Sequence, residues 1–541
     1  MLLEIADHII WFTQDNLYFM IIFNALVVLA MLFFSRKYLV EYFKNKDRLT
    51  WYGIAAIMLI GIFFRIIDST CTGSDGKTWE NVEYSERLLA GKFSLSRADI
   101  DHAKGYALLL AAVFLIFGRA LHNITILNII FSVLTIPIVF FIVECVVKNK
   151  YAGFFAALIF AFMQPAVTAA RFGSEHNIAL FLLSLAFLFF LIYLEKKKNF
   201  LFILAAATLS MATHFRVECT IFAPLFLFYP LFFGEGKKAE RLNAAKFHTA
   251  ILLLFFLQFL AFYILLPIRL SYIEKSENPL IVWANGARGN TEETFDKKYP
   301  EIGKPALFSP NLWGINMAAN IDAMINKSHY PVMMLLFILP SFLALKRHKH
   351  FAILVLWLFS FFLFFGLWWA TSITTPWLYQ ILVLTPIVSL ISIGVFELWM
   401  IVKKIKNSLG KIAKIIFILF LLAIFIFSML KSSPLLSYRD PGNNYCITDE
   451  LAEIGKSIEE GSCIVASSKG ISRMSPYLVA KYTLERQIVV ADRGKCSKKP
   501  IYRLLFLQEL DELPWKECEK DCFYIESEIE KYAMALCKIN C

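Results

Sequence analysis

The chain has 541 residues, of which 58% are hydrophobic and only 18% charged, and its formal net charge is +11. Soluble domains have about 45–50% apolar and about 25% charged residues, so the composition excludes an ordinary soluble protein. The positive charge does not indicate nucleic-acid binding, because Lys and Arg lie in short clusters between apolar blocks, where such clusters set membrane topology.

Apolar blocks recur along the chain up to about residue 430, and each is close to the roughly 20 residues that a membrane-spanning helix needs. We therefore predict a multi-spanning α-helical membrane domain over residues 1–430, with about 12 spans. The predicted spans lie near residues 17–35, 51–67, 124–146, 151–167, 177–194, 199–213, 219–234, 248–268, 332–346, 351–369, 377–400 and 412–430.

Every second connector between these spans is basic, and the positive-inside rule places basic connectors in the cytoplasm. We therefore expect a multi-pass protein of the cell (plasma) membrane with both termini outside, and the acidic first residues give no sign of a cleavable signal peptide. Residues 105–118 are apolar but short, so we expect a helix at the outer interface, with a tilted short span as the alternative. The long polar loops near 68–122, 168–176 and 269–330 then face outward, and we expect the chemistry there.

Residues 431–541 follow the last predicted span and alternate between helical and strand-like patterns. Short apolar runs of this kind are typical of buried strands, so we predict a small extracytoplasmic α/β domain. The predicted strands lie at 463–467, 487–491, 502–507 and 522–525, and the predicted helices at 449–460 and 476–484.

This tail is also rich in cysteine. It contains seven of the ten cysteines, and Cys71 in the first outer loop makes eight on the predicted outer side. An oxidising exterior and an even number favour disulfides, although the pairing cannot be deduced from the sequence. The Cys-x3-Cys pairs at 518/522 and 537/541 leave a zinc tetrathiolate as the alternative. Cys145 and Cys219 lie in or near spans and are expected to be packed thiols.

The first outer loop carries the strongest local signal. Asp68 and Asp75 lie in a carboxylate-rich stretch beside the predicted membrane face, and Trp79 follows Asp75 by four residues. A carboxylate in such a loop can act as a general base toward a hydroxyl group. The alternative is a solvated loop whose acidic residues have no catalytic role.

These residues resemble the first outer loop of the GT-C glycosyltransferases. The shared features are Arg65 near the end of a span, then Asp75, the aromatic Trp79 and the Leu-Leu-x-Gly ending at Gly91. The most similar groups are protein O-mannosyltransferases, aminoarabinose transferases of lipid A and related lipopolysaccharide-core transferases. Their next segment resembles residues 102–118, except that its prolines are missing here.

The resemblance extends over about residues 50–400. The stretch 151–165 is similar to the next helix of these enzymes, and Glu175 stands where their second outer loop has an acidic residue. His214-Phe-Arg216-Val-Glu218 resembles an Arg-x-Glu corner that is common in them. A late segment at 375–386 resembles another of their motifs but lacks its Arg.

The resemblance implies an inverting transfer of a sugar from a polyprenyl-phosphate carrier, such as dolichyl-phosphate mannose, to an acceptor hydroxyl on the outer face. It implies Asp75 as the catalytic base, with Asp68 as the second candidate. Glu175 would orient the acceptor or the sugar, and its alternative is an acidic residue favoured at a helix N-terminus. His102 and His176 are given no role.

Cations must stabilise the departing lipid phosphate, and Arg binds phosphate well because its guanidinium can form two parallel hydrogen bonds. The candidates are Arg216 and Arg171, followed by Lys104 and Arg269; the alternative for each is a side chain reaching to lipid headgroups. We expect no metal site and no cofactor with a monophosphate donor. A divalent cation stays open, because related oligosaccharyltransferases with pyrophosphate carriers need one.

The expected partners are the lipid-linked donor, the bilayer, and a protein, glycan or lipid acceptor, with no nucleic acid. One alternative is a membrane transporter or lipid flippase, which predicts charged or broken helices at mid-membrane and internal repeats. The predicted spans are nearly free of charge, and no repeat is evident. Another alternative is a noncatalytic membrane protein with an outer ligand-binding domain.

Overall fold

The computed structural model describes most of the predicted membrane domain and the strands of the tail. The described residues are 2–66, 76–93, 104–171, 175–233, 238–260, 314, 317–318, 321, 324, 332–368, 380–405, 408–432, 451, 454–456, 458, 463–466, 489–492, 501–506, 519–525 and 534–539.

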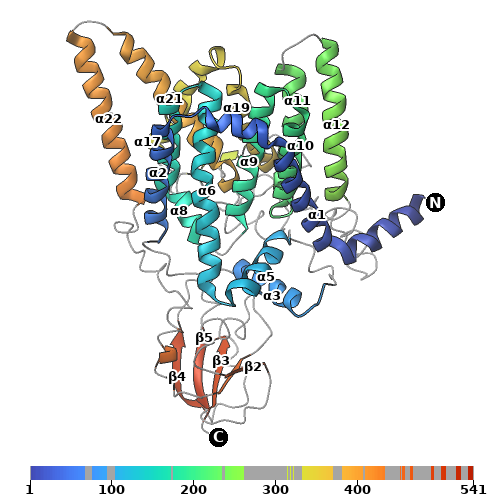
Figure 1. The fold of residues 1–541 in the computed structure, drawn as a ribbon. Coiled ribbons are helices and arrows are strands. Elements are labelled where there is room, and N and C mark those ends of the chain that lie inside the picture. Colours follow the sequence, from blue (N-terminus) through green and yellow to red (C-terminus); the bar gives the residue numbers. More distant parts are fainter. Residues whose placement is uncertain are drawn as a thin grey trace.

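The described part of the first 432 residues is helical (Figure 1). Its α-helices are α1 (Leu2–Lys44), α2 (Arg48–Ile66), α3 (Gly76–Leu89), α5 (Gly105–Phe117), α6 (Leu121–Val147), α7 (Lys150–Phe162), α8 (Gln164–Arg171), α9 (His176–Lys196), α10 (Asn199–Thr213), α11 (Ala223–Phe233), α12 (Lys238–Leu260), α17 (Val332–Leu335), α18 (Ile338–Ser341), α19 (Phe351–Trp368), α21 (Leu384–Lys404) and α22 (Ser408–Ser432). Three 3-10 helices, η1 (Val217–Phe222), η4 (Phe342–Lys346) and η5 (Ile381–Val383), join them.

Among the described residues, five helices are long and apolar enough to cross a membrane, and a sixth span results if the bent pair α7–α8 is counted as one. The five are Leu17–Lys44, Arg48–Ile66, Leu121–Val147, His176–Lys196 and Ile381–Lys404. Several other predicted spans, among them α10 and α19, are shorter apolar helices. A multi-pass membrane protein is therefore supported, and the number of about 12 spans stays a prediction.

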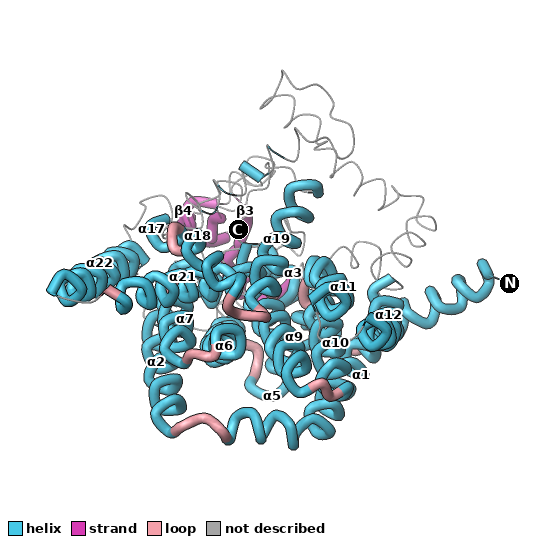
Figure 2. The backbone as a smooth tube through the Cα atoms, turned by 90° about the horizontal axis from the view of Figure 1, so that it is seen from above, coloured by secondary structure: helices cyan, strands magenta, loops and turns pink. Residues whose placement is uncertain are grey.

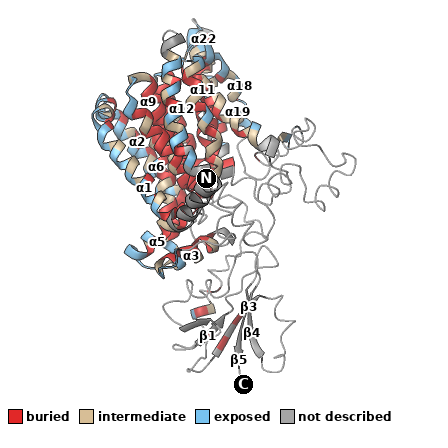
Figure 3. Cartoon of the chain, turned by 90° about the vertical axis from the view of Figure 1, so that its right-hand side faces the viewer, coloured by how far each residue is buried: buried red, intermediate tan, exposed pale blue. Residues whose placement is uncertain are grey.

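The centre of the bundle is formed by α6, α9 and the α21 segment. The share of the apolar window that is buried reaches 83% in α9 and 89% in the α21 span, but only 22% in α1. Seen from above, α7, α6, α9 and α10 lie side by side between α2 and α1 (Figure 2). Buried residues concentrate on these central helices, whereas the outer faces are exposed and apolar (Figure 3), as expected of helices that face lipid.

Two short helices, α3 and α5, pack together at one end of the bundle (Figure 1). We call it the loop end. The 13 residues of α5 extend about 20 Å as a helix, which is less than the hydrocarbon thickness of about 30 Å. Helix α10 is similarly short, so the interfacial position of residues 105–118 stays a prediction. Trp79 and Val82 of α3 are fully buried, so the helix is docked by an apolar face.

The tail contributes a five-stranded mixed sheet, which lies beyond the loop end in Figure 1. Its strands, in the order β2-β1-β3-β5-β4, are β1 (Cys463–Ala466), β2 (Val489–Asp492), β3 (Ile501–Phe506), β4 (Glu519–Ile525) and β5 (Met534–Ile539). The pairs β1–β2 and β1–β3 are parallel, and β5 is antiparallel to both of its neighbours. Four of the strands overlap predicted stretches. The α/β assignment and the boundary at residue 431 stay predictions.

No disulfide is present among the residues that the structure describes, so the expected disulfides are not supported. The side chains of the eight cysteines proposed for pairing lie outside the described part. Cys145 and Cys219 are buried free thiols, as expected from their positions in apolar helices.

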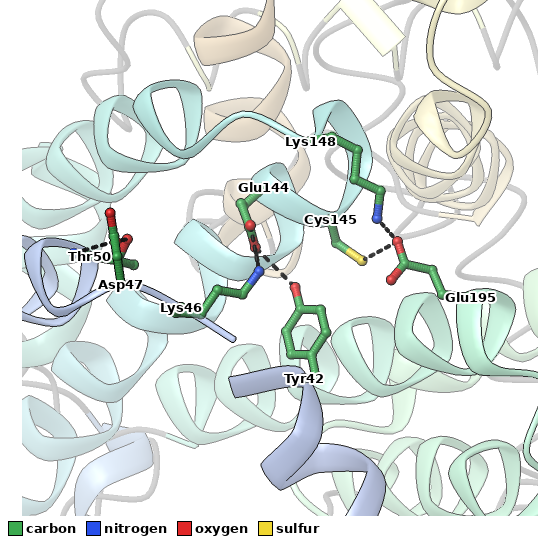
Figure 4. Close-up of polar contacts among 8 residues, drawn as sticks. All are labelled: Tyr42, Lys46, Asp47, Thr50, Glu144, Cys145, Lys148 and Glu195. Carbon is green, nitrogen blue, oxygen red and sulfur yellow. Dashed lines mark hydrogen bonds and ion pairs between the residues drawn. The ribbon is translucent and has the colours of Figure 1, made fainter. Parts of the chain in front are cut away.

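Polar contacts tie the helices together at the opposite end, which we call the connector end (Figure 4). Lys46 Nζ lies 2.5 and 2.6 Å from the two carboxylate oxygens of Glu144, and the Tyr42 hydroxyl donates a hydrogen bond of 3.1 Å to the same carboxylate. Lys148 forms an ion pair with Glu195. These contacts join α1, α6 and α9, whose basic connectors follow directly in the chain.

Asp47 directly precedes α2 and forms a second connector-end contact. Its Oδ1 accepts hydrogen bonds from the backbone N–H and the hydroxyl of Thr50, which is an N-cap arrangement. Lys150 Nζ lies 2.5 Å from the other oxygen. The hydrogen bond from Lys150, followed by those from Thr50, lowers the pKa of Asp47 to about 2. A carboxyl with a lowered pKa stays ionised as the pH falls through its unfolded value, so this contact persists in mild acid.

The connector-end contacts predict a difference between two acidic residues of similar chemistry. Glu144→Gln should lower the free energy of unfolding by about 1–3 kcal/mol, because Lys46 and Tyr42 then lose a shielded charged acceptor. Glu41→Gln removes an exposed ion pair with Lys196 and should change stability little. Thermal unfolding of both variants in detergent measures this. Equal losses would show that the Glu144 contacts are no stronger than an exposed pair.

Candidate active site

Arg216 is the centre of a buried cluster of charges at the loop end. Its Nη1 lies 2.8 Å from Glu175 Oε1, and its Nη2 and Nε lie 2.6 and 3.0 Å from the two oxygens of Glu218. The Arg216 and Glu175 side chains are only 5% and 8% exposed. A guanidinium that binds a carboxylate through two parallel hydrogen bonds has a fixed orientation. Arg216 therefore links two carboxylates that lie 43 residues apart in the sequence (175 and 218).

The backbone turns sharply between the end of α10 and the start of η1. We call this turn, which carries His214 and Arg216, the corner. Helix α10 ends at Thr213, and Phe215 and Arg216 donate their backbone N–H groups back to the carbonyl of Ala212 at 3.1 and 2.9 Å. Arg216 itself is extended, and η1 begins at the next residue. The chain thus turns sharply, and both charged side chains of the Arg-x-Glu sequence come to lie on the same side, where they bond to each other.

Glu175 immediately precedes α9. Its side chain forms no capping hydrogen bond with the helix, although its backbone carbonyl accepts the N–H of Ala179 at 3.0 Å. The carboxylate is instead directed to Arg216. Asn81 of α3 donates a hydrogen bond of 3.3 Å to the second oxygen of Glu175. The geometry therefore favours a role in joining the loops over that of a simple helix-terminal acid.

Lys104 lies at the start of α5 and is almost completely buried. Its Nζ lies 3.9 Å from Glu80 Oε1 and 3.4 Å from the centre of the Tyr84 ring. A cation over an aromatic face is stabilised by the negative charge of the π-system. Because Glu80, Asn81 and Tyr84 all belong to α3, this helix contacts both the lysine before α5 and the acid before α9.

The first residue of α5 is fastened directly to the corner. The backbone N–H of Gly105 donates to the carbonyl of His214 at 2.8 Å. A side chain at this position would place its Cβ 2.6 Å from that oxygen, so only glycine fits. On its other side, the His214 ring nitrogen Nε2 lies 2.7 Å from the amide nitrogen of Asn24 in α1. Helices α1, α5 and α10 therefore meet at one residue.

A small, mainly apolar recess adjoins the corner between α10, η1, α11 and α12. It is lined by Ala206, Leu209, Ser210, Thr213, Thr220, Ala223, Leu252 and Phe255. Ser210 also accepts a hydrogen bond from Asn24 at 3.3 Å. The recess therefore has three polar lining residues, Ser210, Thr213 and Thr220, and its remaining lining is apolar.

The structure brings together Lys104, Glu175 and Arg216 from the candidates that the sequence suggests. Asp68, Asp75 and Arg269 lie outside the described residues, and so does His102. Arg171 is the last residue of α8, but its side chain is not described. In the part of the chain that the structure describes, no group of three or more His, Cys, Asp or Glu side chains is arranged to hold a metal ion.

Sequence reasoning missed two members of the cluster, Glu80 and Asn81. Their signal is the spacing on α3, where residues 80, 81 and 84 lie on one face because a helix repeats every 3.6 residues. Because Trp79 and Val82 are buried, they determine which face of α3 packs against the rest of the protein. Asp75 directly precedes α3 in the sequence.

The tight contact at Gly105 predicts a specific sensitivity. Gly105→Ala should destabilise the protein by about 1–3 kcal/mol, because the added methyl group meets a backbone oxygen rather than a movable side chain. Gly314→Ala is the control, since no atom of the described residues lies within 4 Å of its Cβ position. Thermal unfolding in detergent compares the two. A Gly105→Ala variant as stable as wild type would rule out the close approach of α5 to the corner.

The part of the chain that carries this cluster matches a known protein family. Residues 101–264, which contain Lys104, Glu175 and Arg216, match the dolichyl-phosphate-mannose-protein mannosyltransferase family. No curated protein matches the chain.

Two solved structures show the same fold. Oligosaccharyltransferase AglB from Archaeoglobus fulgidus, in complex with an inhibitory peptide and a dolichol-phosphate, has a TM-score of 0.51 at 14% identity, covering 82% of this chain and 64% of its own. The chain thus spans less than two thirds of that enzyme. ArnT from Cupriavidus metallidurans in the apo state has a TM-score of 0.51 at 11% identity, covering 91% of this chain and 97% of its own. The fold is thus similar to that of these two membrane glycosyltransferases, and residues 101–264 match the mannosyltransferase family, in agreement with the GT-C resemblance of the sequence.

Proposed function

We propose that this protein transfers a sugar from a polyprenyl-phosphate-linked donor to an acceptor hydroxyl on the outer face of the membrane, with inversion at the anomeric carbon. The observation that carries the proposal is the buried Arg216 cluster, which joins Glu175, Glu218 and α3. It lies within the residues that match the mannosyltransferase family. Charged side chains are rarely buried in this way without partners or a function.

In the proposed reaction, the oxygen of the acceptor hydroxyl attacks the anomeric carbon of the donor sugar. The bond from that carbon to the lipid-phosphate oxygen breaks, and the phosphate leaves with the bonding electrons. Asp75 takes the hydroxyl proton as general base, and Asp68 is the second candidate. Glu175 orients the acceptor or the sugar. Asp75 directly precedes α3, and the Asn81–Glu175 hydrogen bond holds this helix beside the second acid.

The leaving phosphate needs positive charge. We assign this role to Lys104 and Arg216 at the loop end, together with Arg171 and Arg269. Arg216 is held by two carboxylates, so it also keeps the corner in shape while the substrate binds.

We propose a monophosphate donor that needs no metal ion. The matching family is that of the dolichyl-phosphate-mannose-protein mannosyltransferases, so mannose and a protein hydroxyl are the first donor and acceptor to test. Glycan and lipid acceptors follow.

The outward orientation of the site rests on the basic connectors. Lys46, Lys148 and Lys196 lie at the connector end, where they form ion pairs with Glu144, Glu195 and Glu41. Basic connectors remain in the cytoplasm under the positive-inside rule. The loop end, which carries the Arg216 cluster, then faces outward, as do both termini in the proposed topology.

The transporter alternative gains two features from the structure. The predicted spans are nearly free of charge in the sequence, but Arg65 in α2 is fully buried, and the span formed by α7 and α8 is bent by 53°. Both features occur in transporters. Here, however, the Arg65 guanidinium donates to backbone carbonyls and Ser132, which gives it a structural use. We therefore retain the transferase function.

The proposed base can be tested with four variants. Asp75→Asn should lower the rate of sugar transfer by about 10²–10⁴, because an amide cannot accept the hydroxyl proton. Asp68→Asn tests the second candidate, and Glu175→Gln should lower the rate less. Glu83→Gln on the exposed side of α3 is the matched control and should retain the wild-type rate.

The assay uses purified protein in vesicles with dolichyl-phosphate mannose and measures mannose transfer to acceptor peptide. Full activity of Asp75→Asn, with loss in Asp68→Asn, would move the base to Asp68. Full activity in both would remove the first-loop base from the mechanism.

A further inference from the structure

The break between α7 and α8 leaves backbone carbonyls without their usual helical donors. Helix α7 ends at Phe162, and Met163 is extended. In a continuous helix, the carbonyl of Ala161 would accept the N–H of residue 165, but Pro165 has no N–H. The N–H of Ala166 turns to Met163 O at 2.9 Å. The end of α7 therefore needs donors from elsewhere in a buried environment.

Arg65 of α2 supplies them. Its Nη1 donates to Ala161 O at 2.7 Å and to Gly61 O at 2.9 Å, and its Nη2 lies 3.5 Å from Phe160 O. Its Nε donates to Ser132 Oγ at 2.8 Å. The guanidinium thus lies at the C-terminal end of α7, where the helix dipole favours a positive charge. Arg65 is completely buried.

The surroundings are shaped to admit this guanidinium. Gly61 lies one turn before Arg65, and a Cβ at this position would lie 2.4 Å from Ile136 Cδ1 and 3.3 Å from Arg65 Nη1. The glycine therefore allows α2 to approach α6 closely enough for the arginine to reach α7. Ser132 of α6 relays the contact, because its hydroxyl lies 3.3 Å from Ala166 O in α8.

The far end of α8 is held in a similar way. Asn177 in the first turn of α9 donates its side-chain amide to Ala169 O at 2.5 Å. Glu175 lies between α8 and Asn177 in the sequence, and its carboxylate is bonded to Arg216. The direction of α8 after the bend therefore determines where Glu175 enters the candidate site.

We propose that Arg65 is a positioning residue of the active site. Its guanidinium takes the place of the N–H that Pro165 lacks, fixes the bend between α7 and α8, and so places Glu175 against Arg216 and Asn81. The active-site part of this inference rests on the proposed transferase function. The contact between Arg65 and the helix break at Pro165 is independent of that function.

A double-mutant cycle tests the pairing. Arg65→Met retains a long apolar side chain but removes all donors, so it should lower the melting temperature. Pro165→Ala restores an N–H that can reach Ala161 O, so Arg65→Met should cost much less in the Pro165→Ala background. Melting-temperature losses that simply add would overturn the proposed replacement. If Arg65→Met does not fold, Ser132→Ala replaces it, because this change removes the acceptor of the Arg65 Nε hydrogen bond. Its melting-temperature loss, expected to be smaller, is then compared with and without Pro165→Ala.

The position of Glu175 is measured without activity by cross-linking. Cysteines at positions 81 and 175, whose native side chains contact each other at their tips, should be joined by a short bifunctional thiol cross-linker. The yield should fall at least twofold when Arg65→Met is added, and Pro165→Ala should not restore it, because a straightened helix also moves Glu175. A yield that Arg65→Met leaves unchanged would overturn the positioning role.

Transfer activity separates this inference from the proposed function. With native cysteines and native Glu175, Arg65→Met should lower kcat for sugar transfer at least tenfold with little change in the KM for donor, and Arg65→Lys should recover part of the rate. A change confined to KM would contradict positioning of the acid. If wild type transfers no sugar while the cross-linking behaves as expected, the proposed function fails and the placement of Glu175 by Arg65 stands.

Discussion

The buried contact between Arg216 and its two carboxylates is the constraint on which the loop end depends. Removing one partner of a buried ion pair leaves an uncompensated charge and costs about 3–5 kcal/mol. Glu175, Glu218 and Arg216 must therefore stay together, and the elements that carry them are held in place by the same requirement. Helix α3 joins through Asn81, and α5 joins through the hydrogen bond from Gly105 to the corner. Segments that are far apart in the chain thus form one polar centre above an apolar bundle.

The two ends of the bundle use charge differently. At the connector end, ion pairs such as Lys196–Glu41 and Lys150–Asp47 are partly exposed, and pairs of this kind contribute little to stability. In the proposed topology they mark the cytoplasmic side, as the positive-inside rule predicts. At the loop end the charges are buried and mutually bonded. Low polarity strengthens electrostatic interactions, so these contacts hold the cluster in one arrangement.

The sequence predicts some of this organisation and not the rest. Long apolar blocks predict α6 and α9 directly, because a span of about 20 apolar residues has few other uses. Glu175 and Arg216 were identified from a resemblance, whereas their contact depends on how α9 and the corner pack. Asn81 was missed because nothing local shows which face of α3 is docked. The break at Met163 had a visible signal in Pro165, since proline inside a predicted span removes a backbone donor. Its partner Arg65 was not predictable, because it comes from a different helix about 100 residues earlier in the chain.

A lipid-linked donor is the central claim, and it is tested most directly by identifying the lipid that the purified protein holds. Native mass spectrometry after addition of a polyprenyl phosphate to the detergent-solubilised protein measures this. The expected result is one bound polyprenyl phosphate per chain that survives removal of bulk phospholipid, with weaker retention when Lys104 is changed to Met. Retention of phospholipid alone, with no preference for the polyprenyl phosphate at any concentration, would contradict the assignment of this chain as a lipid-linked sugar transferase.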